Sequence, residues 1–246
     1  YPLPLVKAPS GFGKTTALSL WARHRSKPTG WYTLMADHGT VEDLLAGVLA
    51  ALIHMLPRNT GLVGVQTKLF NGDLTVQEAN EGIIDALRHE EQITIVIDDA
   101  QLSTRDAIQQ VVSPLGAYSA GHLRFVLAGT HSIHSWLTKE LASRQAKPLD
   151  STHLTFTKGD IETILEETHA PVDADFGREV WERTNGWPLA VQLLLLACQS
   201  ADGGGDISTT TAQITIATYI RDNVLVTLSS ELQQFVLLAT TVNRFN

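Results

Sequence analysis

The stretch "KAPSGFGKTTAL", from Lys7 to Leu18, lies between a short apolar run and a segment with the pattern of a helix. It matches the phosphate-binding pattern G-x-x-x-x-G-K-[ST], except that Ala8 stands where the first glycine is expected. Gly11 and Gly13 allow the backbone to turn its N–H groups inward and form a nest for an anion. The sequence therefore predicts a strand, a phosphate-binding loop and a helix in succession.

The residues after the second glycine have the chemistry that a bound phosphate needs. Lys14 is expected to reach the β- and γ-phosphates, and the Thr15 hydroxyl to bind Mg²⁺. The helix that begins at Thr15 adds partial positive charge at its N-terminus. Ala8 is tolerated if its backbone does not need a positive φ, and Pro9 stiffens that turn. The alternative is a glycine-rich strand–helix connection that binds nothing.

An acidic pair follows a second strand-like run, "ITIVIDD", at Ile93–Asp99. The continuous apolar and β-branched residues are typical of a strand that is buried on both faces of a parallel sheet. Asp98, at the end of the strand, is expected to hold Mg²⁺, and Asp99 to polarise the attacking water. The alternative is that the two acids only begin a solvated turn. The long separation from Lys14 leaves room for a strand–helix insertion, so a further strand is expected between these two strands.

Strand-like and helix-like segments alternate along the first part of the chain. Thr40 with Asp43, and Thr75 with Glu78, have the spacing of capping boxes at helix starts. The expected strands are Leu3–Lys7, Gly30–Met35, Gln92–Ile97, Leu123–Ala128 and His153–Phe156. The expected helices are Thr15–Arg25, Thr40–Leu56, Thr75–His89, Arg105–Val112 (ending before Pro114) and Ile133–Ser143; Gly61–Asp73 is glycine-rich and not assigned. This alternation predicts a doubly wound parallel α/β sheet with helices on both faces.

From Lys158 onward the pattern contains helices only. They are expected at Gly159–His169, Phe176–Thr184, Leu189–Ser200, about Thr211–Leu228 and Ser230–Thr240. The segment "ADGGGD", at 201–206, has the composition of a flexible linker. We therefore expect a nucleotide-binding domain at 1–157, a helical domain at 158–202, and the start of a third domain at 207–246.

The composition limits the class of protein. Hydrophobic residues make up 43% and charged residues 18%, as is usual for a globular protein. The formal net charge of −8 argues against a general attraction to nucleic acid or to anionic membranes. The single cysteine, Cys198, excludes an intramolecular disulfide and favours a reducing, cytoplasmic setting. No run of about 20 apolar residues predicts a membrane span. Both ends are expected to be cut from a longer chain.

Five segments resemble MalT-type regulators in sequence and order: "APSGFGKTT", "WYTL", "IVIDDAQL", "TNGWPLAVQLL" and "ELQQFVLLATTVNRF". These are the large ATP-binding LuxR-type transcription factors of the STAND class of signal-transduction ATPases. The resemblance covers nearly the whole chain, from about Val6 to Phe245. It implies an AAA-like P-loop NTPase domain of the ASCE type, a helical lid domain and the start of a winged-helix domain. In the family, a sensor of helical repeats and a helix-turn-helix follow; neither is in this sequence.

The resemblance also implies roles for single residues. Thr15 and Asp98 are the expected metal ligands, and Lys14 and Asp99 the expected catalytic groups. Pro188 matches the proline of a lid motif that packs near the adenine in relatives. The expected nucleotide contacts are Ala8, Gly11, Phe12, Gly13, Lys14, Thr15, Thr16, Thr130 and Pro188. The implied cofactors are ATP or ADP and Mg²⁺.

Two positions depart from the family pattern. Thr130 stands where relatives often carry an arginine that is thought to sense the γ-phosphate, which puts both sensing and fast hydrolysis in doubt. Gln101 lies near the place of a familiar histidine. His131 and His134 follow the strand expected at Leu123–Ala128, as Thr130 does. Their spacing favours a polar loop over a metal site.

The sequence predicts a nucleotide-controlled switch. ATP with Mg²⁺ would favour an open, self-associating state and ADP a closed one, with slow hydrolysis as a reset; whether hydrolysis occurs is left open. DNA would be bound only through a helix-turn-helix outside this sequence, and no membrane partner is expected. One alternative is a motor-type ATPase, for which no arginine finger can be assigned. Another is a small-molecule P-loop kinase, although the lid segment 158–200 holds only Arg178 and Arg183.

Overall fold

The computed structural model describes residues 3–36, 39–130, 133, 137, 146–168, 176–199, 217–222 and 225–239. The chain forms two compact units. The first comprises Tyr1–Pro9 and Lys14–His153, and the second comprises Ser10–Gly13 and Leu154–Asn246. Four residues of the phosphate loop therefore group with the second unit.

The first unit is built on a five-stranded parallel sheet. Its strands are β1 (Leu3–Lys7), β2 (Thr29–Thr33), β3 (Ile93–Asp98), β4 (Leu123–Gly129) and β5 (Ala146–Leu149), in the order β2-β3-β4-β1-β5. Every residue of β3 is buried, which accounts for its continuous apolar run. Because the strands are parallel, their carboxyl ends meet at one edge of the sheet. The phosphate loop and the acidic pair both begin at that edge.

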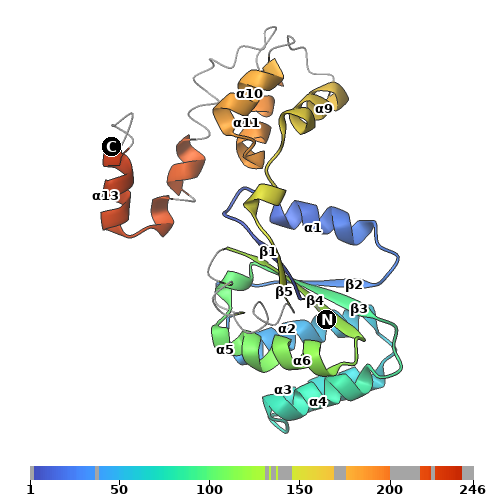
Figure 1. Ribbon diagram of the computed structural model, residues 1–246. Helices are drawn as coiled ribbons and strands as arrows, with labels where there is room; N and C mark the ends of the chain where they lie inside the picture. The colour runs from blue at the N-terminus through green and yellow to red at the C-terminus, as the bar shows by residue number, and fades with distance from the viewer. Residues whose placement is uncertain are drawn as a thin grey trace. The chain divides into compact units, whose positions relative to one another are not determined.

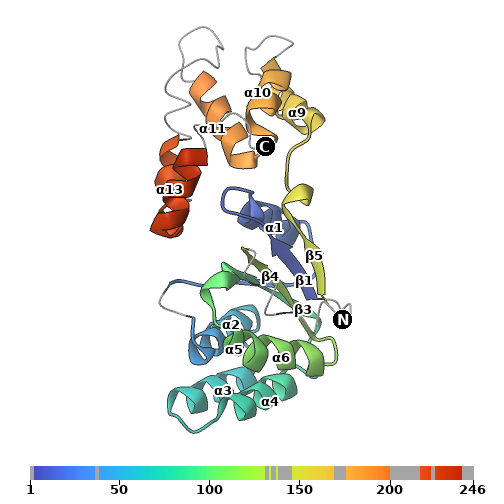
Figure 2. The ribbon, with the colours of Figure 1, turned by 60° about the vertical axis from the view of Figure 1, so that its left-hand side comes forward.

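Helices cover both faces of this sheet, as predicted (Figure 1, Figure 2). On one face lies α1 (Lys14–Arg23), and on the other lie α2 (Val41–Met55), α5 (Arg105–Ala107) and α6 (Ser113–Tyr118). A further layer outside these is formed by α3 (Thr60–Phe70) and α4 (Val76–Ala86). The main core includes the buried residues Leu44, Leu45, Val48, Leu49, Leu52, Ile83, Ile95, Ile97, Ile108, Val111, Phe125 and Leu127. Both predicted capping boxes are present, at Thr40 and at Thr75.

The expected helix stop before Pro114 is wrong. A π-helical turn at Ile108–Val112 joins α5 to α6, and Pro114 lies in the first turn of α6. A proline inside a helix removes the N–H that would pair with the carbonyl four residues earlier. Here that carbonyl, on Gln110, accepts a hydrogen bond of 2.7 Å from Nδ2 of the nearly buried Asn80 instead. The helix therefore continues past the proline with the Gln110 carbonyl satisfied.

The unassigned glycine-rich segment Gly61–Asp73 overlaps α3, and one expected strand is absent. The Asn59 side chain accepts from the Leu62 N–H at the start of α3, and the helix buries Leu62 and Val65. No strand forms at His153–Phe156. The edge strand β5 ends earlier, and Ser151–His153 forms a 3₁₀ turn. Asp150 favours the turn because its carboxylate accepts the Thr152 N–H and pairs with Nδ1 of His153.

The second unit contains α9 (Lys158–Thr168), α10 (Phe176–Thr184), α11 (Pro188–Gln199) and α13 (Ser230–Ala239). The first three share a small core formed by Ile161, Leu165, Phe176, Val180, Val191, Leu194 and Leu195. Of the helix expected at 211–228, residues 217–222 are helical and Leu225–Thr227 form a 3₁₀ turn. No helix in the described ranges is long and apolar enough to span a membrane.

Some expectations fall outside the described residues. They include most of the helix at Ile133–Ser143, with His134, and also His131 and the linker at 201–206. The side chain of Cys198 is likewise not described.

Candidate nucleotide-binding site

The phosphate loop leaves β1 at Ala8, which is fully buried and donates its N–H to the Gly129 carbonyl at 3.1 Å. Gly11 and Gly13 have φ values of +81° and +71°, which favour glycine. Ala8 is not among the described residues with positive φ. An alanine therefore fits the position of the usual first glycine without backbone strain.

Lys14 begins α1, and its ammonium group lies over the base of the loop. Its Nζ donates to the carbonyls of Ala8 at 2.9 Å and Pro9 at 3.1 Å. Burial lowers the pKa of Lys14, while the charges of Asp99 and Asp98 act in the opposite direction. The lysine is therefore a partly desolvated cation that faces the acidic pair.

The two predicted metal ligands are in contact. Thr15 Oγ1 donates to Asp98 Oδ2 at 2.7 Å, and Asp98 Oδ1 accepts from the backbone N–H of Asp99 at 3.0 Å. Asp98 is only 1% exposed. A hydroxyl beside a carboxylate suits Mg²⁺, which binds few protein ligands and completes its octahedron with phosphate oxygens and water. In the part of the chain described, no three His, Cys, Asp or Glu side chains cluster as a complete metal site, so such outside ligands would be needed.

Asp99 has a left-handed backbone, with φ 52°. Its Oδ1 accepts from Gln101 Nε2 at 3.0 Å, and Gln101 Oε1 accepts from the Thr130 N–H at 3.2 Å. One glutamine thus connects the residue expected to polarise water with the position where relatives often have a sensor arginine. In the sequence, Gln101 stands out only as a departure from the family pattern. That departure was the one available signal of its role.

The first unit brings together most of the predicted site residues. Ala8, Lys14, Thr15, Asp98, Asp99 and Thr130 all lie where strands β1, β3 and β4 end. Thr16 is exposed on α1. Gly11, Phe12 and Gly13 group with the second unit, which also contains Pro188. The roles of these residues remain predictions.

The lid turn, defined here as Asn185–Pro188, joins α10 to α11. Asn185 and Gly186 are both left-handed, with φ 48° and +74°, and Pro188 is the first residue of α11, as expected from its fixed φ. The Gly186 carbonyl accepts from the Phe156 N–H at 2.9 Å. A Cβ on Gly186 would lie 2.1 Å from the Phe156 carbonyl oxygen, so only glycine fits.

Within the second unit, the loop tip contacts the residues that follow this turn. The Leu189 N–H donates to the Gly11 carbonyl at 3.1 Å. A Cβ on Gly11 would lie 2.9 Å from the Trp187 indole, so the ring lies directly against the glycine backbone. The Trp187 indole nitrogen is buried without a hydrogen-bond partner among the described residues. Ser10 and Tyr219 share a hydrogen bond of 2.8 Å between their hydroxyls.

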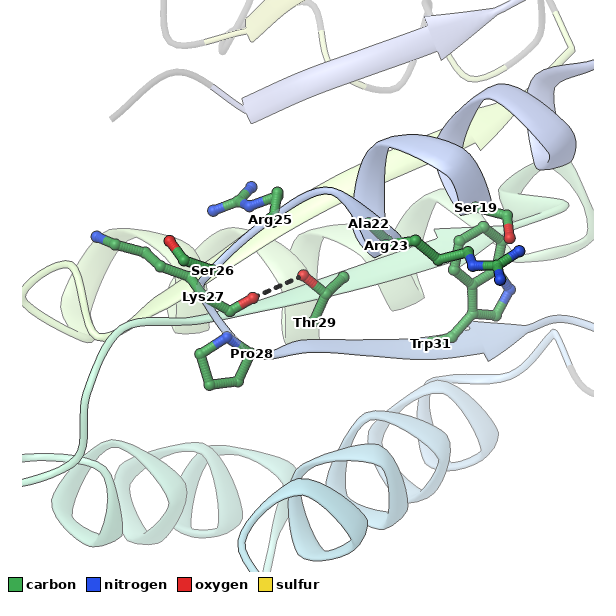
Figure 3. Close-up of a pocket in the computed structure, with 9 residues that line it drawn as sticks. All are labelled: Ser19, Ala22, Arg23, Arg25, Ser26, Lys27, Pro28, Thr29 and Trp31. Carbon is green, nitrogen blue, oxygen red and sulfur yellow. Dashed lines mark hydrogen bonds between the residues drawn. The ribbon is translucent and has the colours of Figure 1, made fainter.

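A separate hollow of about 450 Å³ opens at the far end of α1 (Figure 3). Its lining residues are Ser19, Ala22, Arg23, Arg25, Ser26, Lys27, Pro28, Thr29 and Trp31. Arg25 and Lys27 point away from Arg23 (Figure 3). The Arg25 guanidinium stacks over Trp21, and Lys27 Nζ donates to Gln92. The cations of this hollow therefore do not converge on one point. At 1.5 Å per helical residue, Arg23 lies about 14 Å along α1 from Lys14, so the hollow is separate from the phosphate loop.

One family model and several curated proteins match this chain. The family described as "AAA domain" matches residues 2–137. The serine/threonine-protein kinase PknK of Mycobacterium tuberculosis is 24% identical over 257 residues, which cover 98% of this chain and 22% of that protein. The HTH-type transcriptional regulator MalT of Cronobacter sakazakii is 22% identical over 251 residues, 100% of this chain and 28% of that protein. The chain thus spans less than a third of either relative.

Solved structures show a looser likeness. Cdc6p from Pyrobaculum aerophilum is 18% identical with a TM-score of 0.49, over 84% of this chain and 57% of that chain. RuvB from Thermotoga maritima is 14% identical with a TM-score of 0.48, over 90% and 63%. Likeness at this level says nothing about function.

The parallel sheet and the family match confirm the predicted α/β P-loop fold, and the similarity to MalT confirms the resemblance first seen in the motifs. The chain belongs to the AAA domain family and resembles the P-loop module of MalT-type regulators.

Proposed function

We propose that this chain is the nucleotide-binding switch module of a LuxR-type transcriptional regulator. The observation that carries the proposal is the contact between Thr15 Oγ1 and Asp98 Oδ2, because it joins the phosphate loop to the acidic strand at a place suited to Mg²⁺. The similarity to MalT over the full chain supports the regulatory setting.

In this proposal ATP binds through the loop and Lys14. The Lys14 ammonium would exchange its hydrogen bonds to the carbonyls of Ala8 and Pro9 for bonds to the β- and γ-phosphates. A charge-assisted bond to phosphate is stronger than a bond to a neutral carbonyl. Bound ATP would supply Mg²⁺ with phosphate oxygens beside Thr15 and Asp98. ATP, ADP and Mg²⁺ are therefore the proposed cofactors.

Hydrolysis is proposed to be slow and to act as a reset. Asp99 would orient and polarise the attacking water, and Lys14 would stabilise the charge that develops on the phosphates. Thr130 has no charge to add to that stabilisation. A switch does not need fast turnover, because differential affinity for ATP and ADP is enough to shift two states.

The lid turn is proposed to read the nucleotide through Pro188. The turn is held by backbone bonds and by left-handed residues, so the proline ring has a fixed position within its unit. Packing of this ring on the adenine would favour the closed, ADP-bound state. The contacts of the loop tip with Trp187 and Leu189 support a link between the loop and this turn.

Calorimetry on Pro188→Ala tests the switch. Alanine suits a helix start well enough to keep α11. ADP affinity should fall about fivefold while ATP affinity changes less than twofold, because the contact is made only in the closed state. Gln192→Ala, at an exposed position on the same helix, is the control and should leave both affinities unchanged. Equal losses for the two nucleotides, or none, would reduce Pro188 to a helix start.

The regulatory setting is proposed to be cytoplasmic and to involve self-association of the whole protein with ATP. DNA would be bound through a helix-turn-helix elsewhere in that protein. The chain itself, with a net charge of −8, should not bind one duplex specifically. A gel shift of one particular duplex that persists at high salt would contradict this.

A further inference from the structure

Gln101 lies two residues after Asp99, in the 3₁₀ turn Ala100–Leu102, and its side chain turns back toward the sheet edge. Its amide uses both ends. Nε2 donates to Asp99 Oδ1 at 3.0 Å, and Oε1 accepts from the Thr130 N–H at 3.2 Å. The two partners belong to different strand ends, one after β3 and one after β4. We call this arrangement the Gln101 bridge.

The chemistry of the partners fixes which way the amide points. A backbone N–H can only donate, and an ionised carboxylate can only accept. Reversing the amide would place its NH₂ against the Thr130 N–H and its oxygen against the Asp99 carboxylate, and both bonds would be lost. A glutamate could satisfy Thr130 but not Asp99, and a leucine could satisfy neither.

The end of β4 has the shape that the bridge needs. A Cβ on Gly129 would lie 2.6 Å from Gln101 Oε1 and 2.1 Å from Ile133 Cδ1. Gly129 is not among the glycines with positive φ, so a side chain there would cause crowding rather than backbone strain, and the ends of Gln101 and Ile133 would have to move. Any side chain at this position would push the glutamine off Thr130.

Asp99 itself is constrained from two sides. Its left-handed backbone, with φ 52°, sets the direction of its side chain, and its N–H is bonded to Asp98 Oδ1 at 3.0 Å. Gln101 holds the carboxylate from the other side. A shift of the backbone at Thr130 would therefore pull on the amide and change the orientation of the Asp99 carboxylate.

We propose that Gln101 is a positioning residue that couples the Asp99 carboxylate to the backbone at the end of β4. Its effect on hydrolysis rests on the proposed function of Asp99. The Thr130 side chain carries no charge with which to contact a phosphate. Through the bridge, the backbone of Thr130, rather than a sensor side chain, sets how well Asp99 is placed for water activation.

The coupling is measured first without hydrolysis, by NMR-detected hydrogen exchange of the Thr130 amide in the folded chain. Gln101→Leu removes an acceptor worth about 1 kcal/mol, so exchange should become about fivefold faster. Gln101→Glu keeps the acceptor and should keep the protection. Asp99→Gly removes the carboxylate at a backbone angle that suits glycine, and should speed exchange less. Combined with Gln101→Leu, it should add nothing further.

The second measurement is steady-state ATP hydrolysis by the same variants. Both Gln101→Leu and Gln101→Glu should lower kcat about tenfold or more, with KM changed less than threefold, since misplacing a catalytic group slows the chemistry and spares ground-state binding. Gln109→Leu, at an exposed position in the same unit, is the control for loss of a glutamine.

The two measurements separate the two ideas. If the wild-type chain hydrolyses no ATP, the proposed reset fails, and the exchange data alone decide whether the bridge exists. Unchanged Thr130 exchange in Gln101→Leu overturns the bridge, whatever the hydrolysis rate. Faster exchange with an unchanged kcat, in a chain that does hydrolyse ATP, overturns the positioning role.

Discussion

Asp99 and Asn185 share a left-handed backbone conformation, which is uncommon outside glycine, but they form different kinds of hydrogen bond. Both are left-handed, with φ 52° and 48°, and each lies just before a helical segment. At Asp99 the side chain carries the contacts, through Gln101. At Asn185 the backbone carries them, through a bond of 2.7 Å from its N–H to the Trp181 carbonyl. The acidic turn, Asp98–Leu102, therefore fixes the position of a carboxylate, whereas the lid turn fixes the start of a helix.

The largest expected effect comes from removing the cation that faces the acidic turn. Lys14→Ala should lower ATP affinity by about 3 kcal/mol, roughly 100-fold, because a charge-assisted bond to phosphate is lost. The fold should survive, since among the described residues Nζ donates to the carbonyls of Ala8 and Pro9 alone. Calorimetry and circular dichroism test both statements, with Lys68→Ala, exposed on α3, as the control. Wild-type affinity in Lys14→Ala would mean that the loop is not a nucleotide site.

The lid turn should respond in stability rather than in chemistry. Gly186→Ala adds a Cβ that would lie 2.1 Å from the Phe156 carbonyl oxygen, at φ +74°. Left-handed strain and overpacking together should lower the free energy of unfolding by about 3 kcal/mol in urea. Gly64→Ala is the matched control, because its Cβ would meet nothing within 4 Å. Equal stability of the two variants would show that the turn is not held as described.

Substitutions of the two acids sharpen the contrast within the acidic turn. Asp99→Asn keeps a residue that tolerates the left-handed backbone. It should keep ATP affinity within about threefold and lower the hydrolysis rate about 100-fold, as expected for loss of a general base. Asp98→Ala should instead weaken the Mg²⁺-dependent part of ATP binding, about tenfold. Titrations with and without Mg²⁺ distinguish the two, and equal losses in both variants would merge their roles.

Lys14 also gives the acidic turn a pH dependence that the lid turn lacks. Burial lowers the pKa of Lys14 below 10.5 in the folded state. Between the lowered pKa and 10.5 the unfolded chain binds more protons, so this contribution to stability rises with pH. Lys14→Met has no amine to titrate, so without nucleotide the stability of the wild type relative to this variant should increase as pH rises toward 10.5. A pH-independent difference in urea unfolding would show that the lysine is not desolvated.

The smallest effect is expected from giving Asn185 the residue type of Asp99. Asn185→Asp retains tolerance of the left-handed backbone, and its side chain is exposed. Stability should change by less than about 0.5 kcal/mol, and nucleotide affinity not at all. A large loss would show that the amide of Asn185 makes contacts as important as those of the Asp99 carboxylate.

The sequence predicted those parts of the fold that depend on local chemistry. The β-branched run Ile93–Ile97, the two capping boxes and the phosphate loop each carry their signal within a few residues. The helix end predicted at Pro114 was wrong because the Gln110 carbonyl, which loses its usual N–H partner, is satisfied by the Asn80 amide from another helix. The edge strand β5 was missed because its short segment "AKPL" has no alternating pattern.

The candidate site divides in the same way. Lys14, Thr15, Asp98 and Asp99 could be named from spacing and residue type alone. The Gln101 bridge could not, because Thr130 lies 29 positions away and meets Gln101 only through the pairing of β3 with β4. A strand does lie between β1 and β3, as expected, but it is β4, from downstream of the acidic pair, and not a strand from the intervening segment.

The strand order also has a consequence for the time at which the protein matures. β1 pairs with β4 and β5, as in Leu5 with Leu127 and Leu3 with Ala146. β1 must therefore wait for partners that are synthesised more than a hundred residues later. At about 5–20 residues per second, that wait is roughly 6–25 s. Until β4 emerges from the ribosome, β1 has no neighbouring strand to pair with, and the loop that follows it is not held at the edge of a sheet. A nascent chain should therefore acquire nucleotide affinity late and abruptly.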